Sequence, residues 1–137
     1  MGVVKIKDIT NIILNCSHKL MSFIDNIDNL TEADFIFLLV LIGQYLYAKY
    51  SSYGTLKGNS YYVYPNDIMN AFANTKFKIY ARDVILLRNI VCHDYGSDEM
   101  IHSFNDFKSD TETLNEFLKY LFPVSPFDSS IGMMADK

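Results

Sequence analysis

One short segment of this chain holds residue types that could act on a phosphate ester. The sequence has two arginines and three histidines in 137 residues, and Arg88 and His93 stand five positions apart with Asn89 between them. A histidine titrates near neutral pH, so it can accept or return a proton. An arginine can hold a phosphate through two parallel N–H bonds and stabilise charge that develops on it. Together they could take the proton from a ribose 2′-hydroxyl and cleave RNA without a metal ion.

The surrounding segment predicts a helix that begins after Asn74 and Thr75 and ends near Gly96. At about 100° per residue, its apolar positions form a core face made of Tyr80, Val84, Leu87, Ile90 and Val91. The opposite side carries polar residues, namely Lys78, Arg82, Asn89 and His93. Arg88 lies at the edge of that polar stripe, about 140° around the axis from His93. The two would meet if the helix ended near His93, or if a second copy of the chain supplied one of them across a shared cleft.

Charge is unevenly distributed along the chain. The formal net charge of −4 argues against a protein that coats nucleic acid by bulk positive charge. Residues 49–88 nevertheless hold six basic and two acidic groups, whereas residues 94–136 hold two basic and nine acidic groups. Positive charge is therefore concentrated ahead of His93, where Lys78 and Arg82 could contact RNA phosphates.

Three other interpretations of the same residues stay open. The polar helix face could dock a partner or a nucleotide, as charged helix faces without catalytic function do. Arg88 and His93 could be rim groups of a purely structural helical dimer. His93 could also bind a metal with Asp94, Asp98 or His102, although no diagnostic ligand spacing is present.

The rest of the chain predicts one helical domain. Apolar residues recur every three or four positions from Ile6 to Ile27, which predicts an amphipathic helix. A second helix starts at Thr31, where Thr31 and Asp34 resemble a capping box, and runs to about Tyr50. It is apolar on most of its circumference and must be buried on several sides. Residues 51–65 are expected to form a loop, with Tyr61 to Tyr64 as a short extended piece.

Local signals place the remaining helices. Asn66 is the expected cap of a short helix that reaches Ala73, with Asp67 in its first turn. Gly96 suits a left-handed helix end, and Ser97 starts the next helix. Asp110 or Thr111 caps a last helix through Leu121. We expect an all-α fold, an up-and-down four-helix bundle with additional short helices and no strands, over residues 1–122, and a flexible tail over residues 123–137.

Composition also bears on location and chemistry. Cys16 and Cys92 fall at apolar helix positions, so we expect buried thiols rather than a disulfide or a metal site. The longest apolar run, Phe35 to Ile42, is far shorter than the ~18 residues that cross a membrane. The N-terminus has no secretory pattern, so the expected location is cytoplasmic, without membrane contact.

The segment from Arg88 to Tyr95 resembles the R-x4-H-x-Y motif of HEPN domains, in particular of HepT-type toxins. Asn89 after the arginine and Tyr95 two places after the histidine both match the motif. Ile42-Gly43-Gln44 is a looser echo of the Ile-Gly-Glu that the family often carries in its second helix. The motif also lies near the end of the penultimate long helix, as in the family, whereas the tyrosine-rich segment 51–65 is unusual for these compact toxins.

The resemblance implies a homodimer whose two motifs line one cleft and act as an endoribonuclease without a cofactor. Arg88 and His93 would be catalytic, and Asn89 would shape the site. Such toxins are commonly paired with a nucleotidyltransferase antitoxin that adds AMP to the motif tyrosine, here Tyr95. Related HEPN proteins are partner subunits of nucleotidyltransferases without established nuclease activity, which is the alternative function.

Overall fold

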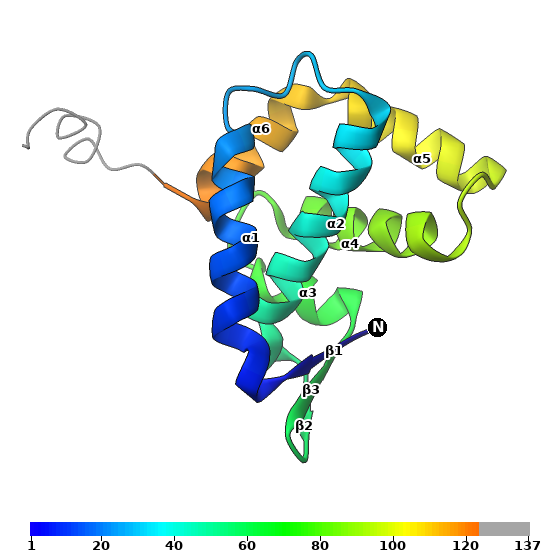
Figure 1. Ribbon diagram of the computed structural model, residues 1–137. Coiled ribbons are helices and arrows are strands. Elements are labelled where there is room, and N and C mark those ends of the chain that lie inside the picture. The colour runs from blue at the N-terminus through cyan, green and yellow to red at the C-terminus, as the bar shows by residue number, and fades with distance from the viewer. Residues whose placement is uncertain (124–137) are drawn as a thin grey trace, which may run out of the picture.

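Six α-helices and a small three-stranded antiparallel sheet make up the structure (Figure 1). It is a computed structural model that describes residues 1–123. The helices are α1 (Ile9–Phe23), α2 (Glu32–Lys49), α3 (Pro65–Ala71), α4 (Lys78–His93), α5 (Asp98–Ser109) and α6 (Thr111–Leu121). The strands are β1 (Gly2–Lys5), β2 (Thr55–Lys57) and β3 (Ser60–Val63). The predicted predominance of helix is confirmed, and the expectation of no strands is wrong. The predicted flexible tail lies outside the described residues from 124 onward.

Several helix ends follow the predicted capping residues. The Thr31 hydroxyl accepts from the Asp34 amide and the Asp34 carboxylate accepts from the Thr31 amide, both at 3.1 Å. Ser97 and Asp110 cap α5 and α6 through their side chains. Gly96 has a φ of +90°, a left-handed conformation that favours glycine. The three N-cap predictions are confirmed, because a cap needs only residues within one turn. Gly96 has the predicted left-handed backbone, but α4 ends at His93 with Asp94 as its C-cap, so Gly96 lies in the turn that follows and does not cap the helix.

Two predicted helix starts are wrong. Asn66 lies inside α3, which begins at Pro65, and the carboxylate of Asp67 accepts from the Tyr64 amide at 2.8 Å. Proline suits a first helical position because its missing N–H would have no partner there. At the N-terminus, α1 begins at Ile9 rather than Ile6, because residues 6–8 form a 3-10 turn after β1. Ile6 itself is exposed.

Helix α2 is the most buried element of the fold. Ten of its eighteen residues are buried, which confirms the expectation from its apolar sequence. It packs side by side with α1, and α4 crosses it (Figure 1). Leu38, Leu39, Ile42 and Leu46 are fully buried in the core that these helices share. The predicted buried thiol of Cys16 is confirmed, whereas Cys92 is exposed and that prediction is wrong.

The sheet pairs the N-terminus with a hairpin far along the chain. Strand β3 lies between β1 and β2, and β1 pairs with it from Gly2 opposite Val63 to Lys5 opposite Ser60. The hairpin turns at Gly58 and Asn59, and Gly58 has a φ of +62°. Much of the predicted loop 51–65 is therefore ordered secondary structure, and the extended piece predicted at Tyr61 to Tyr64 is largely β3. Val4 and Val63 anchor the sheet in the core.

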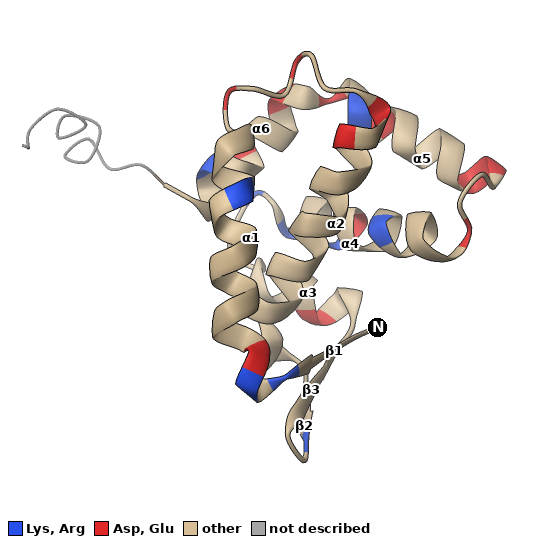
Figure 2. Cartoon of the chain, viewed as in Figure 1, with Lys and Arg blue, Asp and Glu red and all other residues tan. Residues whose placement is uncertain are grey.

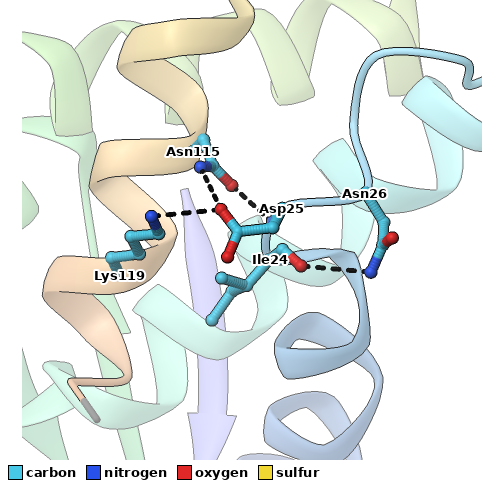
Figure 3. Close-up of polar contacts among 5 residues, drawn as sticks. All are labelled: Ile24, Asp25, Asn26, Asn115 and Lys119. Carbon is cyan, nitrogen blue, oxygen red and sulfur yellow. Dashed lines mark hydrogen bonds and ion pairs between the residues drawn. The ribbon is translucent and has the colours of Figure 1, made fainter. Parts of the chain in front are cut away.

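A polar clamp joins the turn after α1 to α6 (Figure 3). Asp25 has a φ of +63°, and its amide donates to the side chain of Asn115 at 2.8 Å. Its carboxylate accepts from Asn115 at 2.9 Å and pairs with Lys119 at 3.0 Å. The hydrogen bonds from Asn115 and Lys119 lower the pKa of Asp25 below its ordinary value. The α1–α2 turn and α6 are thus held together on the surface.

None of the helices that residues 1–123 form combines the length and the apolar character needed to cross a bilayer.

Candidate functional site

Helix α4 carries most of the predicted site residues, and it ends at His93. Val84, Leu87 and Val91 are buried as predicted, and Tyr80 and Ile90 are partly buried against the core. Ala81 and Ile85 are also fully buried, although the predicted core face did not include them. They extend the buried face around the helix toward Arg88. Arg88 therefore lies on the packed side of α4 and not at the edge of the solvated stripe.

Arg88 packs against α2 at a glycine. A Cβ atom placed on Gly43 would lie 2.9 Å from Cγ of Arg88, so only a glycine admits the arginine in its present position. One turn along α2, the ring of Tyr47 lies beneath the guanidinium, with 5.8 Å between Cζ and the ring centroid. That distance falls within the range of a cation–π interaction. The stem of Arg88 is thus packed in place rather than free in solvent.

Polar contacts complete this arrangement. Nη1 of Arg88 donates to Oδ1 of Asn89 at 3.1 Å, and Nδ2 of Asn89 donates to the Tyr47 hydroxyl at 3.5 Å. We call Gly43, Tyr47 and Asn89 the Arg88 platform. Tyr47 is only 4 % exposed, and burial raises the pKa of its phenol, so it remains a neutral partner. Nε of Arg88 is buried without a hydrogen-bond partner, and within residues 1–123 no ion pair involves this arginine.

His93 faces different surroundings. It lines an open groove of about 670 Å³ between α4 and α5, which we call the α4–α5 groove. The groove has an apolar floor that includes Val84, Leu87, Ile90 and Phe107. Five carboxylates also line it, namely Asp83, Asp94, Glu99, Asp106 and Asp110, whereas no lysine or arginine of residues 1–123 does. Figure 2 shows acidic positions at the start of α5 and in the turn that joins it to α4.

Among residues 1–123, Arg88 does not line the α4–α5 groove that His93 lines. Asn89 is the link between them, because it bonds Arg88 and also lines the α4–α5 groove. The two predicted phosphate contacts lie farther along α4. Lys78 is exposed at the other end of the helix, about 22 Å along the axis from His93. Arg82 pairs with Asp83 at 3.0 Å, so part of its charge is neutralised.

Tyr95 is accessible. It lies in the turn between α4 and α5 and is 60 % exposed. It is two residues beyond His93 and one before the left-handed Gly96. A modifying enzyme could therefore reach its hydroxyl.

Sequence reasoning missed Tyr47 and the packing role of Gly43. The signal was present in their spacing, since residues four apart on a helix share a face. A glycine and a tyrosine at such positions can form a recess with an aromatic floor. What the spacing could not reveal is which helix would cross that recess.

The metal alternative gains no support. No group of three or more His, Cys, Asp or Glu side chains in residues 1–123 could hold a metal ion. His102 pairs instead with Asp106 on its own helix, with 3.7 Å between Nε2 and Oδ2.

Comparisons with family models, with curated proteins and with solved structures found no significant match to this chain.

Proposed function

We propose that this chain is a HEPN-type helical bundle that acts, as a homodimer, as a metal-independent endoribonuclease. Arg88 and His93 are its catalytic residues, and Asn89 shapes the site. In this proposal the protein is the toxin of a pair whose antitoxin is a nucleotidyltransferase. The supporting motif is the R-x4-H-x-Y segment that ends α4.

One observation carries the proposal: Arg88 is held in place but has no carboxylate partner within residues 1–123. The chain has sixteen acidic residues, yet Arg88 bonds only the neutral amide of Asn89 within the described residues. A positioned arginine usually pairs with a carboxylate, which neutralises its charge. Here Gly43 and Tyr47 hold the side chain, and the charge remains available for an anion such as a phosphodiester.

The proposed cleavage reaction uses Arg88 of one chain and His93 of the other, and its protons and bonds balance. One His93 takes the proton of the ribose 2′-hydroxyl, whose oxygen then forms a bond to phosphorus. The bond from phosphorus to the 5′-oxygen breaks, and the same His93, now protonated, returns the proton to that oxygen. Arg88 stabilises the charge on the pentacoordinate phosphorus. The products are a 2′,3′-cyclic phosphate and a free 5′-hydroxyl.

A second copy is needed because Arg88 and His93 have separate surroundings in one chain. About 7.5 Å of helix axis and 140° of rotation separate them. A two-fold axis near the end of α4 would bring Arg88 of one protomer toward His93 of the other. Tyr95, exposed beside His93, is then the residue on which an AMP group would obstruct RNA.

Mixing two inactive variants tests the shared cleft. Arg88→Ala and His93→Ala homodimers should each lack cleavage activity. After subunit exchange, half of the dimers are mixed and each holds one intact pair, so about a quarter of the native activity should return. A mixture that stays inactive after proven exchange would overturn the shared cleft. A native protein that neither cleaves RNA nor arrests growth of a bacterial host would overturn the ribonuclease proposal.

One observation favours the alternative, a non-catalytic partner subunit of a nucleotidyltransferase. His93 lines a groove with five carboxylates, which repel the phosphates of RNA. In that case, His93→Ala should weaken the complex with the nucleotidyltransferase, and purified protein should leave RNA intact. Cleavage that His93→Ala abolishes would decide for the ribonuclease.

A further inference from the structure

The α4–α5 groove combines an apolar floor with an acidic rim. Val84, Leu87, Ile90 and Phe107 line its interior, and Leu86 lies on the same lining and is 41 % exposed. Val84, Leu87 and Phe107 are almost fully buried and Ile90 is partly buried, so Leu86 is the apolar side chain of this lining that a partner could contact most extensively. The five carboxylates come from both walls, Asp83 and Asp94 from the α4 side and Glu99, Asp106 and Asp110 from the α5 side.

We infer that this groove is the docking site for a basic amphipathic helix of a partner protein. Such a helix would place its apolar stripe on the floor and its lysine and arginine side chains beside the carboxylates on each wall. Charge complementarity of this kind selects the partner and speeds association.

The dimensions of the groove fit a helix. Its lining follows α4 from Tyr80 to Asp94, which is about 21 Å of helix axis. A partner helix of about four turns has the same length. Along α5 the lining runs back from Asp110 to Glu99, so the two walls are of similar length.

Charge argues against three other occupants. RNA would bring phosphates against the carboxylates. A second copy docked groove to groove by two-fold symmetry would set the same carboxylates against one another. The chain's own residues 124–137 contain Asp128, Asp136 and a single lysine, Lys137, so they offer no excess of positive charge.

A helix in this groove would also cover His93, which lines it. Binding would therefore compete with any use of that histidine. Peptide binding is measured without RNA cleavage, so a failure to bind leaves the ribonuclease proposal standing.

The probe is a fluorescein-labelled 18-residue peptide with a leucine stripe flanked by lysines. Its matched control carries glutamate at every lysine position. Fluorescence anisotropy with the full 137-residue chain should show saturable binding of the lysine peptide and none of the glutamate peptide. Equal binding of both peptides would overturn the inference, and so would no binding of either.

Two pairs of substitutions locate the site. Glu99→Gln with Asp106→Asn removes two groove carboxylates, and binding of the lysine peptide should weaken about tenfold. Asp28→Asn with Glu112→Gln removes two carboxylates that do not line the groove, and affinity should change less than about twofold. Circular dichroism checks that all variants fold. Equal losses in the two pairs would mean unspecific attraction and would overturn the inference.

Two competitors complete the test. Single-stranded RNA should not displace the peptide from Arg88→Ala, which lacks the proposed phosphate-binding cation; displacement from that variant would make the groove a nucleic-acid site. Phe127→Ser with Ile131→Ser should leave the affinity unchanged. A gain in affinity would identify the chain's own C-terminal segment as the occupant.

A loss of peptide affinity in Leu86→Ser would support the docking site, because this side chain is exposed and lines the groove.

Discussion

The two sides of α4 offer opposite surroundings to two residues of one motif. Arg88 lies on an aromatic, charge-neutral platform against α2, made by Gly43, Tyr47 and Asn89. His93 lies at the end of the helix and lines a groove that five carboxylates also line. Among residues 1–123, the same helix therefore carries a cation without a carboxylate partner on one side and lines an acidic groove on the other. Spacing along a helix therefore does not by itself make a shared site.

The largest expected effect is a loss of RNA cleavage when the guanidinium of Arg88 is removed. Arg88→Ala should lower RNA cleavage about 10²- to 10³-fold, because the stabilising donor of the transition state is lost. Arg88→Lys should recover little, since an ammonium lacks the planar fork. Single-turnover cleavage of a labelled RNA measures both.

The control for this prediction is Arg82→Ala, which removes the same charge from the same helix. Arg82 is already paired with Asp83, so cleavage should fall only a few-fold. Equal losses in Arg82→Ala and Arg88→Ala would mean that general positive charge matters and the platform does not.

Gly43→Ala, a substitution in the Arg88 platform, should lower the free energy of unfolding when Arg88 is present and raise it when Arg88 is absent. Gly43→Ala should lower the free energy of unfolding by about 1–2 kcal/mol, because the added methyl group meets Cγ of Arg88. In an Arg88→Ala background the space is free, and the same change should stabilise the helix by about 1 kcal/mol. Urea unfolding of the four proteins gives the coupling. Additive effects would show that Arg88 does not depend on the glycine.

The smallest expected effect is a change in melting temperature, and it comes from the clamp that joins Asp25 to α6. Its lowered pKa means that the carboxylate contributes stability above its unfolded pKa of about 3.9 and loses it as the pH falls through the folded value. Asp25→Asn keeps a residue that tolerates positive φ but loses the pair with Lys119. The melting temperature of the native chain should exceed that of the variant at pH 7.

That difference should shrink as the pH falls from 5 to 3, and the two melting curves should converge. Asp28→Asn is the control, because Asp28 makes no hydrogen bond or ion pair within residues 1–123. Its difference from the native chain should stay small at every pH. A constant gap between Asp25→Asn and the native protein would contradict the assigned pKa. Neither substitution should alter cleavage per folded molecule.

Several helix boundaries could be predicted because they depend on interactions between neighbouring residues. Thr31 with Asp34, Ser97 and Asp110 satisfy the first amides of their helices, and Gly96 adopts the left-handed backbone conformation in the turn after α4. Each of these effects acts within one turn, so each could be predicted from neighbouring residues. The burial of α2 could also be predicted, because apolar residues cover most of its circumference.

Other features depend on contacts between distant residues. Strand β1 pairs with β3 about sixty residues later, and strands of three or four residues are too short to show alternation. The one local signal of the hairpin was Gly58-Asn59, a pair that suits a two-residue turn. No pattern within residues 1–8 predicted that β1 would pair with β3.

The sequence by itself determined which residues could do chemistry and where the helix that carries them ends. Only the tertiary structure decided what each of them faces. Arg88 turned out to lie on the packed side of α4 because Gly43 leaves room for it on α2, and that glycine is 45 residues away. His93 lines an acidic groove because α5 folds back along α4. Helical periodicity gives angles around one axis, whereas packing against a second helix sets which of those angles is the inside.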